Sequence, residues 1–363
     1  MSGGTRVGRI VLAASTLPAL VLAGCGTAMN SSSSSPAGGG IQPQSQPATG
    51  PILGYVWDSA GAALRPVQGL PGASIVGAAL ISAPSSGAGF IATASSGVSG
   101  AALFLDANGG IFTSPLTGAK LTQVASIPGA TSLYLSHSGA YALVTGKNAS
   151  GVNIASVISG LPQSPSVRSL DASALRSILG GAASDTGTVA LAGSGQSGVV
   201  FVAYSGQGAG AQVGAAQAFG GMQFVPGSDE LVVGDSSSGA LTAISHVNTT
   251  PSSATLSPAG GISAPLALDI TPNGRWVVAA NHAGDVLRVD LTGAIAATKV
   301  HCSCAPSQVA ALNGSAAGTT VRLVTAGGGP LWILDASVAA PRVLFIPAIT
   351  PASISTIATK SAM

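Results

Sequence analysis

The chain of 363 residues is 46% hydrophobic but only 7% charged, and its formal net charge is +2. Ordinary soluble domains carry roughly 25% charged residues, so this chain is unusually poor in charge. Without Arg6 and Arg9, both near the N-terminus, 11 basic and 11 acidic residues remain. A chain with this balance and no cluster of Lys or Arg lacks the positive surface that nucleic acids require, so we expect no nucleic-acid partner.

The N-terminal segment has the pattern of an export signal. Two arginines precede an apolar run from Ile10 to Leu22, which is shorter than the roughly 20 residues that span a bilayer. The run therefore favours a cleaved leader over a transmembrane anchor. It ends in Leu-Ala-Gly-Cys at residues 22–25, a sequence that resembles the lipobox of bacterial lipoproteins.

The resemblance to bacterial lipoproteins implies a signal peptide at residues 1–24, cleavage before Cys25, and lipidation of Cys25 with diacylglycerol and palmitate. An ordinary secretory leader with a chance cysteine is the alternative. Residues 25–50 are rich in Ser, Pro, Gly and Gln without an apolar period, which predicts a flexible linker. We therefore expect a protein of the cell envelope, anchored to a membrane by its N-terminal lipid and facing the periplasm or the exterior.

The remaining residues, 51–363, are expected to form one all-β domain. Gly is abundant (51 residues), and Glu230 is the only Glu in the chain; glycine marks turns, whereas helices use Glu on their solvent faces. A unit of two apolar strands joined by a polar turn recurs seven times, opened by Gly54, Gly100, Gly151, Gly198, Gly239, Gly284 and Gly329. The spacing of 41 to 51 residues matches a propeller blade. The sequence predicts a seven-bladed β-propeller, with six blades as the alternative.

A second series of glycines predicts how the ring closes. Turns between two apolar strands occur at Gly87, Gly139, Gly187, Gly227, Gly274 and Gly318. We interpret these six as first-to-second strand turns and the seven opening glycines as the starts of third strands. The chain then enters at a third strand, and the last blade is closed by N-terminal and C-terminal strands, the latter at Ala352–Thr359. Closure of this kind removes exposed sheet edges.

Several predicted third strands end in aspartate, at Asp58, Asp106, Asp290 and Asp335. With the pair Trp57-Asp58, this pattern resembles WD40-type and YVTN-type bacterial propellers, which implies the same seven-bladed fold. The alternative is that any hairpin favours Asp at such a junction, because its side chain accepts hydrogen bonds from the nearby backbone.

Two segments resemble cofactor-binding or metal-binding motifs, but each lacks a feature that the motif requires. Residues 193–198 fit G-x-G-x-x-G but lead into a strand, whereas a dinucleotide site needs a helix there. Residues 106–110 resemble the start of a calcium loop but lack the later ligands. We therefore predict no catalytic residue and no cofactor.

One cluster combines His301, Cys302 and Cys304, with His282 expected on the same face. Thiolates and imidazoles suit zinc or copper, so a metal site is one alternative. In an oxidising envelope, cysteines two residues apart can instead form a disulfide where the chain bends. We expect the Cys302–Cys304 disulfide ahead of free thiols and of a metal.

The sequence leaves two classes of function open. The first is a binding or scaffolding module of the envelope with an envelope protein as partner. The second is a periplasmic propeller enzyme, either a lactonase-like hydrolase or a quinoprotein. Propeller enzymes gather carboxylates, histidines or arginines at the channel, and this chain has only 11 acids and 4 histidines; we therefore favour the binding module.

Overall fold

Short apolar segments separated by Gly and Asp turns form strands throughout the described chain. The computed structural model describes residues 50–84, 89–118, 120–206, 208–314, 318–324, 329–337 and 339–348. These belong to one unit, Pro47–Met363, distinct from Met1–Gln46. Within the described residues there is no helix, and so none long and apolar enough to cross a membrane. The predicted signal peptide, Cys25, Gly87 and Ala352–Thr359 lie outside the described residues.

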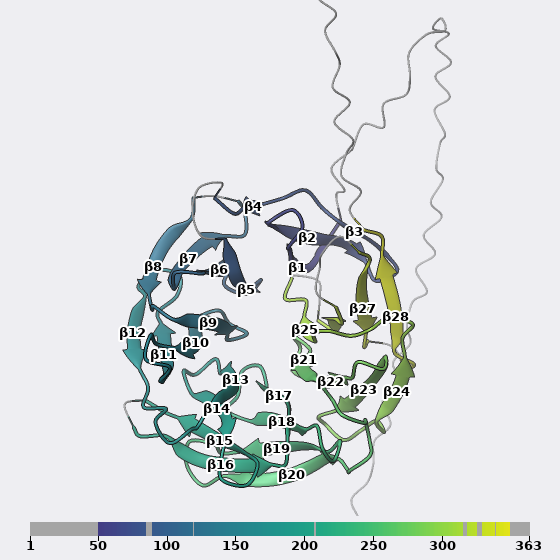
Figure 1. The fold of residues 1–363 in the computed structure, drawn as a ribbon. Coiled ribbons are helices and arrows are strands. Elements are labelled where there is room, and N and C mark those ends of the chain that lie inside the picture. Colours follow the sequence, from purple (N-terminus) through teal and green to yellow (C-terminus); the bar gives the residue numbers. More distant parts are fainter. Residues whose placement is uncertain are drawn as a thin grey trace, which may run out of the picture. The chain divides into compact units, whose positions relative to one another are not determined.

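Seven sheets of four antiparallel strands confirm the predicted seven-bladed propeller (Figure 1). Blades 1 to 3 contain β1 (Ile52–Asp58), β2 (Ala63–Leu70), β3 (Ala73–Val76), β4 (Ile81–Ser82); β5 (Phe90–Ser96), β6 (Ala101–Asp106), β7 (Gly110–Pro115), β8 (Thr122–Ser126); β9 (Ala130–Leu135), β10 (Tyr141–Lys147), β11 (Asn153–Ser159), β12 (Ser166–Ser169). Blades 4 and 5 contain β13 (Ile178–Ala183), β14 (Val189–Ser194), β15 (Val199–Tyr204), β16 (Ala211–Ala216); β17 (Phe219–Phe224), β18 (Leu231–Asp235), β19 (Leu241–Ser245), β20 (Ser252–Ser257). Blades 6 and 7 contain β21 (Ala267–Ile270), β22 (Trp276–Ala280), β23 (Asp285–Asp290), β24 (Thr298–His301); β25 (Ala310–Ala311), β26 (Thr320–Arg322), β27 (Leu331–Asp335), β28 (Arg342–Ile346).

Apolar side chains fill each of the seven interfaces between neighbouring blades. Between blades 4 and 5, for example, buried Phe201 packs with Phe224 and Leu231. The interface between blades 7 and 1 is filled in the same way, by Leu53 with Ile333 and others. Burial of apolar surface at every interface is therefore what closes the ring in the described residues.

Hydrogen bonds also link the turns between first and second strands of neighbouring blades. Ser96 donates through Oγ to the carbonyl of His137, at 2.7 Å. The carboxylate of Asp185 accepts from the backbone N–H of Ser138 at 2.6 Å and of Gly227 at 2.8 Å, so it joins blades 3, 4 and 5. All of these turns lie on one face of the propeller. We call it the A–B face, where A and B denote the first and second strands of a blade.

Blade 1 differs from the others in the direction of its inner strand. β1 begins beside the residues that follow β25, because the N–H of Gly314 donates to the carbonyl of Leu53 at 2.9 Å. It ends beside the start of β5, where the rings of Trp57 and Phe90 lie 5.8 Å apart. β1 therefore runs antiparallel to β5 and β25, in the direction of a second strand.

The predicted entry of the chain at a third strand is therefore wrong. Four strands from Ile52–Ser82 form the first sheet, with β3 and β4 both pairing with β2, and none comes from the C-terminal part that is described. Gly100 opens the second strand of blade 2 and not the third, so Asp106 ends a second strand. In blades 3 to 7 both glycine series lie where predicted. The error arises because the hairpins between consecutive strands of a blade have similar sequences. They reveal the repeat length of a blade but do not show which strand of the blade comes first.

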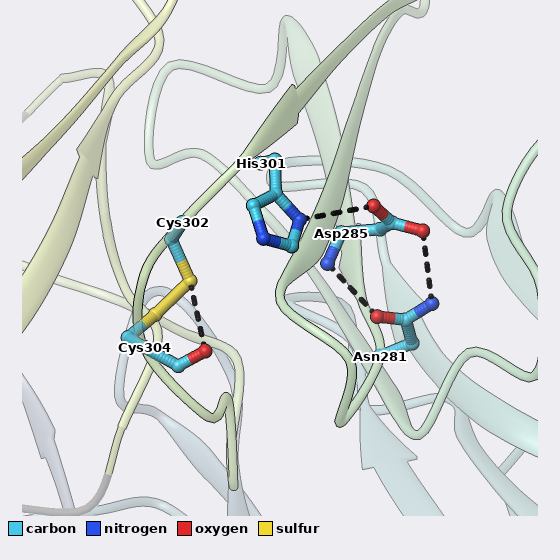
Figure 2. The surroundings of a disulfide bond; sticks show 5 residues. All are labelled: Asn281, Asp285, His301, Cys302 and Cys304. Atoms are coloured by element: carbon cyan, nitrogen blue, oxygen red, sulfur yellow. Dashed lines mark hydrogen bonds and ion pairs between the residues drawn. A yellow bond between two sulfur atoms is a disulfide. The ribbon is translucent and has the colours of Figure 1, made fainter.

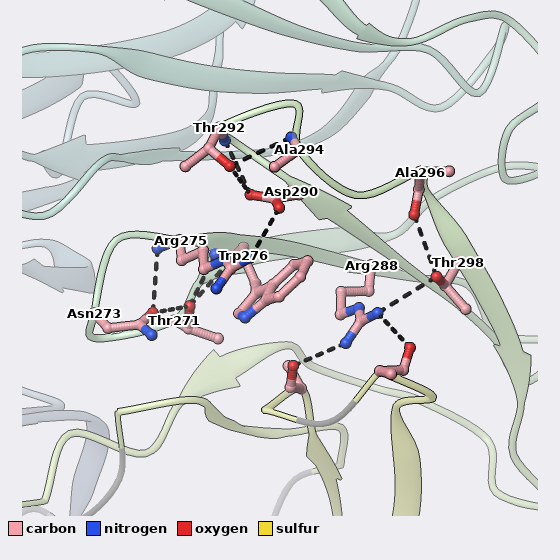
Figure 3. A network of polar contacts seen from close by, with 12 residues as sticks. Thr271, Asn273, Arg275, Trp276, Arg288, Asp290, Thr292, Ala294, Ala296 and Thr298 are labelled. Atoms are coloured by element: carbon pink, nitrogen blue, oxygen red, sulfur yellow. Dashed lines mark hydrogen bonds and ion pairs between the residues drawn. The ribbon is translucent and has the colours of Figure 1, made fainter. Parts of the chain in front are cut away.

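A buried arginine connects blades 6 and 7. Arg288 on β23 is 1% exposed and donates to the carbonyls of Ala336 at 2.9 Å and Ala339 at 3.0 Å. Its guanidinium lies 4.1 Å from the ring centre of Trp276, with Arg275 over the same ring at 4.6 Å (Figure 3). Charge-assisted hydrogen bonds to carbonyls compensate the burial of this cation.

Candidate ligand site in the central channel

The cysteine cluster singled out in the sequence forms a disulfide. Cys302 and Cys304 are bonded, with their sulfur atoms 1.98 Å apart (Figure 2). Beside them, the exposed His301 lies with Nδ1 3.3 Å from Asp285 Oδ1. His282 is exposed on the neighbouring loop. With the bond formed, neither sulfur is available as a thiolate ligand.

The carboxylate of Asp285 binds other groups around this disulfide. Lys299 Nζ lies 2.9 Å from Asp285 Oδ2, and Asn281 Nδ2 donates to the same oxygen at 3.4 Å. Lys299 and His301 hold the pKa of Asp285 below its usual value. In the described part of the chain, no three or more His, Cys, Asp or Glu residues are grouped so that they could hold a metal ion. This region is therefore best described as a disulfide-braced loop with a surface ion pair.

A cavity at the centre of the ring is a different candidate site. It has a volume of about 340 Å³, and residues from the innermost strands of all seven blades line it. Its aromatic lining residues are Tyr55, Trp57, Tyr134 and Phe219. Asp269 and Arg322 are the charged residues among the described ones that line it. Pockets of this size and mixed lining are typical of small-molecule sites.

Asp269 lies on β21 and connects three inner strands. Its Oδ1 accepts from the backbone N–H of Ile270 at 2.7 Å and from Gln223 Nε2 on β17 at 3.1 Å. Its Oδ2 accepts from the N–H of Ala311 on β25, at 2.7 Å. Burial nevertheless raises the pKa of Asp269, because desolvation outweighs these hydrogen bonds.

Arg322 reaches the cavity from β26. Its Nη2 donates to Gln308 Oε1 at 2.8 Å, while its buried Nε–H has no hydrogen-bond partner among the described residues. Burial lowers the pKa of Arg322 to about 10, and the negative charge of Asp269 partly opposes this. No ion pair links the guanidinium to Asp269 among the described residues.

The channel continues from this cavity towards the A–B face. A smaller cavity shares Gln223 and Asp269 with it and extends to His137 and Asp185. His137 also lines a hollow of about 340 Å³ between the A–B turns. His137 lies in the turn between β9 and β10, and the closed ring brings it to the mouth of the channel.

The sequence did not single out Asp269, Gln223, Gln308 or Arg322. The one available signal was a carboxylate at an alternate position of an otherwise apolar first strand, Leu-Asp-Ile at residues 268–270. Alternation predicts that its side chain lies on the opposite face of the strand from Leu268 and Ile270. It does not show which other strands face it, because that depends on the closed ring.

Comparison with known proteins supports the fold alone. No family model matches the chain, and no curated protein does. Among solved structures, 83% of the chain superposes on PorZ, a bacterial surface component of the type-IX secretion system of Porphyromonas gingivalis, at 13% identity and a TM-score of 0.54. That match covers 39% of PorZ. A functionally unknown protein from Desulfotomaculum acetoxidans matches over 82% of this chain and 99% of its own, at 12% identity and a TM-score of 0.53. At such identities the likeness establishes a β-propeller without assigning a function.

Proposed function

We propose that this protein is a lipid-anchored binding module of the cell envelope that holds a small ligand in its central channel. The observation that carries the proposal is the cavity of about 340 Å³ into which Asp269 and Arg322 bring opposite charges without forming an ion pair. Strands of the blades position both groups, Asp269 on the inner strand β21 and Arg322 on the second strand β26, and such positioning favours binding. The loops and outer strands of the propeller remain available to an envelope protein partner.

Two features support export. The N-terminal segment has the basic, apolar and cysteine parts of a lipoprotein leader. The Cys302–Cys304 disulfide belongs to the type of bond that persists in oxidising compartments outside the cytosol. PorZ, described as a bacterial surface component, is an example of a propeller-like fold in that setting.

Lipidation can be tested by metabolic labelling with an alkyne analogue of palmitate. We expect the intact protein to take up the label and to fractionate with membranes. Cys25→Ser should lose both properties, whereas Cys304→Ser should keep the label because its lipid site is intact. An unlabelled intact protein, or a Cys25→Ser variant that still carries the label, would contradict the anchor.

Channel binding can be tested by thermal shift of the full chain in detergent against a library of small metabolites. A true channel ligand raises the melting temperature, since it binds the folded state. The shift should shrink in Arg322→Gln and persist in Arg342→Gln, whose side chain is 58% exposed on the outer strand β28. An equal rise in melting temperature in the intact protein and in Arg322→Gln would show that the ligand binds outside the channel. If no compound in the library raises the melting temperature, channel binding is contradicted.

The envelope partner can be sought by crosslinking intact cells that carry the tagged protein. We expect one stoichiometric envelope protein in the crosslinked product. Its recovery should be lost with Cys25→Ser, because the anchor holds the propeller at the membrane. Recovery of abundant proteins only, in equal yield from both forms, would contradict a specific partner.

A hydrolase is the second candidate, because Asp269, Arg322 and His137 converge on the channel. Asp269 combines a raised pKa with a position in the same small cavity as His137, which suits a general acid or base. Binding remains favoured since three donors already occupy the Asp269 carboxylate. Hydrolysis of lactones by the purified protein, abolished in Asp269→Asn, would reverse this preference.

A further inference from the structure

The two charged residues of the channel form side-chain hydrogen bonds with neutral partners and not with each other. Asp269 receives its side-chain hydrogen bond from Gln223, and Arg322 donates to Gln308. Gln308 precedes β25 in the connection between blades 6 and 7, whereas Gln223 lies on β17. The amides therefore orient an acceptor and a donor towards one cavity from different blades.

Neither charge is fully compensated by the protein. Burial raises the pKa of Asp269 and lowers that of Arg322 to about 10, so that desolvation disfavours both charged forms. The buried Nε–H of Arg322 also has no acceptor among the described residues. Buried charged groups are costly unless an opposite charge and hydrogen bonds compensate them. Beyond the partial compensation that Asp269 and Arg322 give each other, the cavity leaves a place for a cation beside Asp269 and an anion beside Arg322.

We propose that the channel binds a zwitterion of the size of an amino acid or dipeptide, with its ammonium group at Asp269 and its carboxylate at Arg322. The proposal rests on the proposed function, because it names the ligand of the same cavity. Guanidinium groups bind carboxylates through charge-assisted hydrogen bonds, often two at once. A neutral sugar could form hydrogen bonds to both residues but would leave both charges without a partner.

The rest of the cavity indicates the ligand's side chain. Tyr134 on β9 and Phe219 on β17 line the wall, together with Tyr55 and Trp57 of β1. Aromatic walls favour apolar or aromatic groups, which they contact over large areas. We therefore expect phenylalanine or leucine to bind more tightly than glycine.

The test is calorimetry on the full chain with individual amino acids and dialanine, followed by derivatives of the tightest binder. Removing the carboxylate as an amide, or the positive charge by N-acetylation, should each weaken binding at least tenfold, a loss of about 1.4 kcal/mol. This series changes the ligand and leaves the protein intact. Equal binding of the parent and both derivatives would overturn the proposal.

Paired variants connect the ligand's carboxylate to one residue. Arg322→Gln should weaken the zwitterion tenfold or more while affecting the amide derivative little, and the matched Arg342→Gln should alter neither. Glucose, tested in parallel, should not bind. Glucose binding that depends on Arg322 would overturn the zwitterion and leave the channel as a binding site. If no amino acid or dipeptide binds in calorimetry and no metabolite of the library raises the melting temperature, the proposed function is contradicted as well.

Discussion

Arg288 shows how one residue can stabilise the contact between two blades. Its guanidinium is buried, lies over Trp276 and donates to two carbonyls of blade 7. Arg275 lies over the same ring but is 42% exposed, and it pairs with the buried carboxylate of Asp290. The two arginines thus offer the same chemistry at different depths, which permits a controlled comparison.

We expect Arg288→Met to lower the free energy of unfolding by about 3 kcal/mol, because two charge-assisted hydrogen bonds are lost and the carbonyl of the buried Ala336 loses this donor. Arg275→Met should cost less than Arg288→Met, because the guanidinium of Arg275 is 42% exposed and the buried carboxylate of Asp290 keeps its hydrogen bonds from Thr292. Urea unfolding of both variants measures the difference. Equal losses would show that the contact with Trp276, and not burial, dominates.

Asp269 should give stability an unusual pH dependence. Because its pKa is raised in the folded state, the folded protein holds this proton more tightly than the unfolded chain does. Its contribution is therefore most favourable below the ordinary Asp pKa of about 4 and declines as the pH rises from there towards the folded value. Comparing unfolding curves of the intact protein and Asp269→Asn across this range isolates the effect. A difference curve that rises with pH would contradict the raised pKa.

At the scale of elements, the turns on the A–B face act as connectors. Asp185 bonds the N–H groups of Ser138 and Gly227, which belong to different blades. Asp106, by contrast, accepts from Asn108 and Gly110 within its own hairpin. The same residue type therefore stabilises either a contact between blades or a single turn.

Asp185→Ala should cost about 1–3 kcal/mol, the penalty for leaving charge-assisted hydrogen bonds unmade. Hydrogen exchange should accelerate in the A–B turns of blades 3 and 5 as well as blade 4. Asp106→Ala should accelerate exchange only around the β6–β7 hairpin. Exchange changes confined to blade 4 in Asp185→Ala would contradict its connecting role.

The sequence predicted the strands and the number of blades well. It predicted less well which strand of a blade each segment forms, and which residues of different blades share a cavity. The glycine period gave seven blades because Gly139 and its counterparts are needed at turns with positive φ, which is 76° at Gly139. The same glycine pattern assigned Gly100 to the start of a third strand, although it precedes the second strand of blade 2, because the hairpins before second and third strands are similar. Asp269 and Arg322 were missed for another reason: they lie on different blades, and only ring closure brings their side chains to one cavity.

At the scale of the whole propeller, we expect the outer edge of blade 1 to open early. Its outer edge is divided between the short strands β3 and β4, and Leu70 and Ile75 are 63% and 47% exposed there. β1 also runs against the other inner strands. Regions with short strands and exposed apolar residues open at lower free energy than compact cores.

Hydrogen exchange should therefore show residues 52–82 exchanging before the strands of blades 4 and 5. Mass spectrometry of peptides from both regions measures the order under native conditions. Reduction of Cys302–Cys304 should not alter this order, because that disulfide lies between blades 6 and 7. Uniform exchange of all seven blades would show instead that the ring opens only as a whole.

Residues from every blade line the central cavity, so ligand binding there depends on a complete ring of seven blades. A molecule seated there touches groups that are far apart in the sequence and that separate as soon as one blade detaches. Its binding energy is consequently available only to the complete ring and is withdrawn from every partly opened form. A filled channel would thus serve as a keystone that makes the ring resistant to gradual unfolding, one blade at a time.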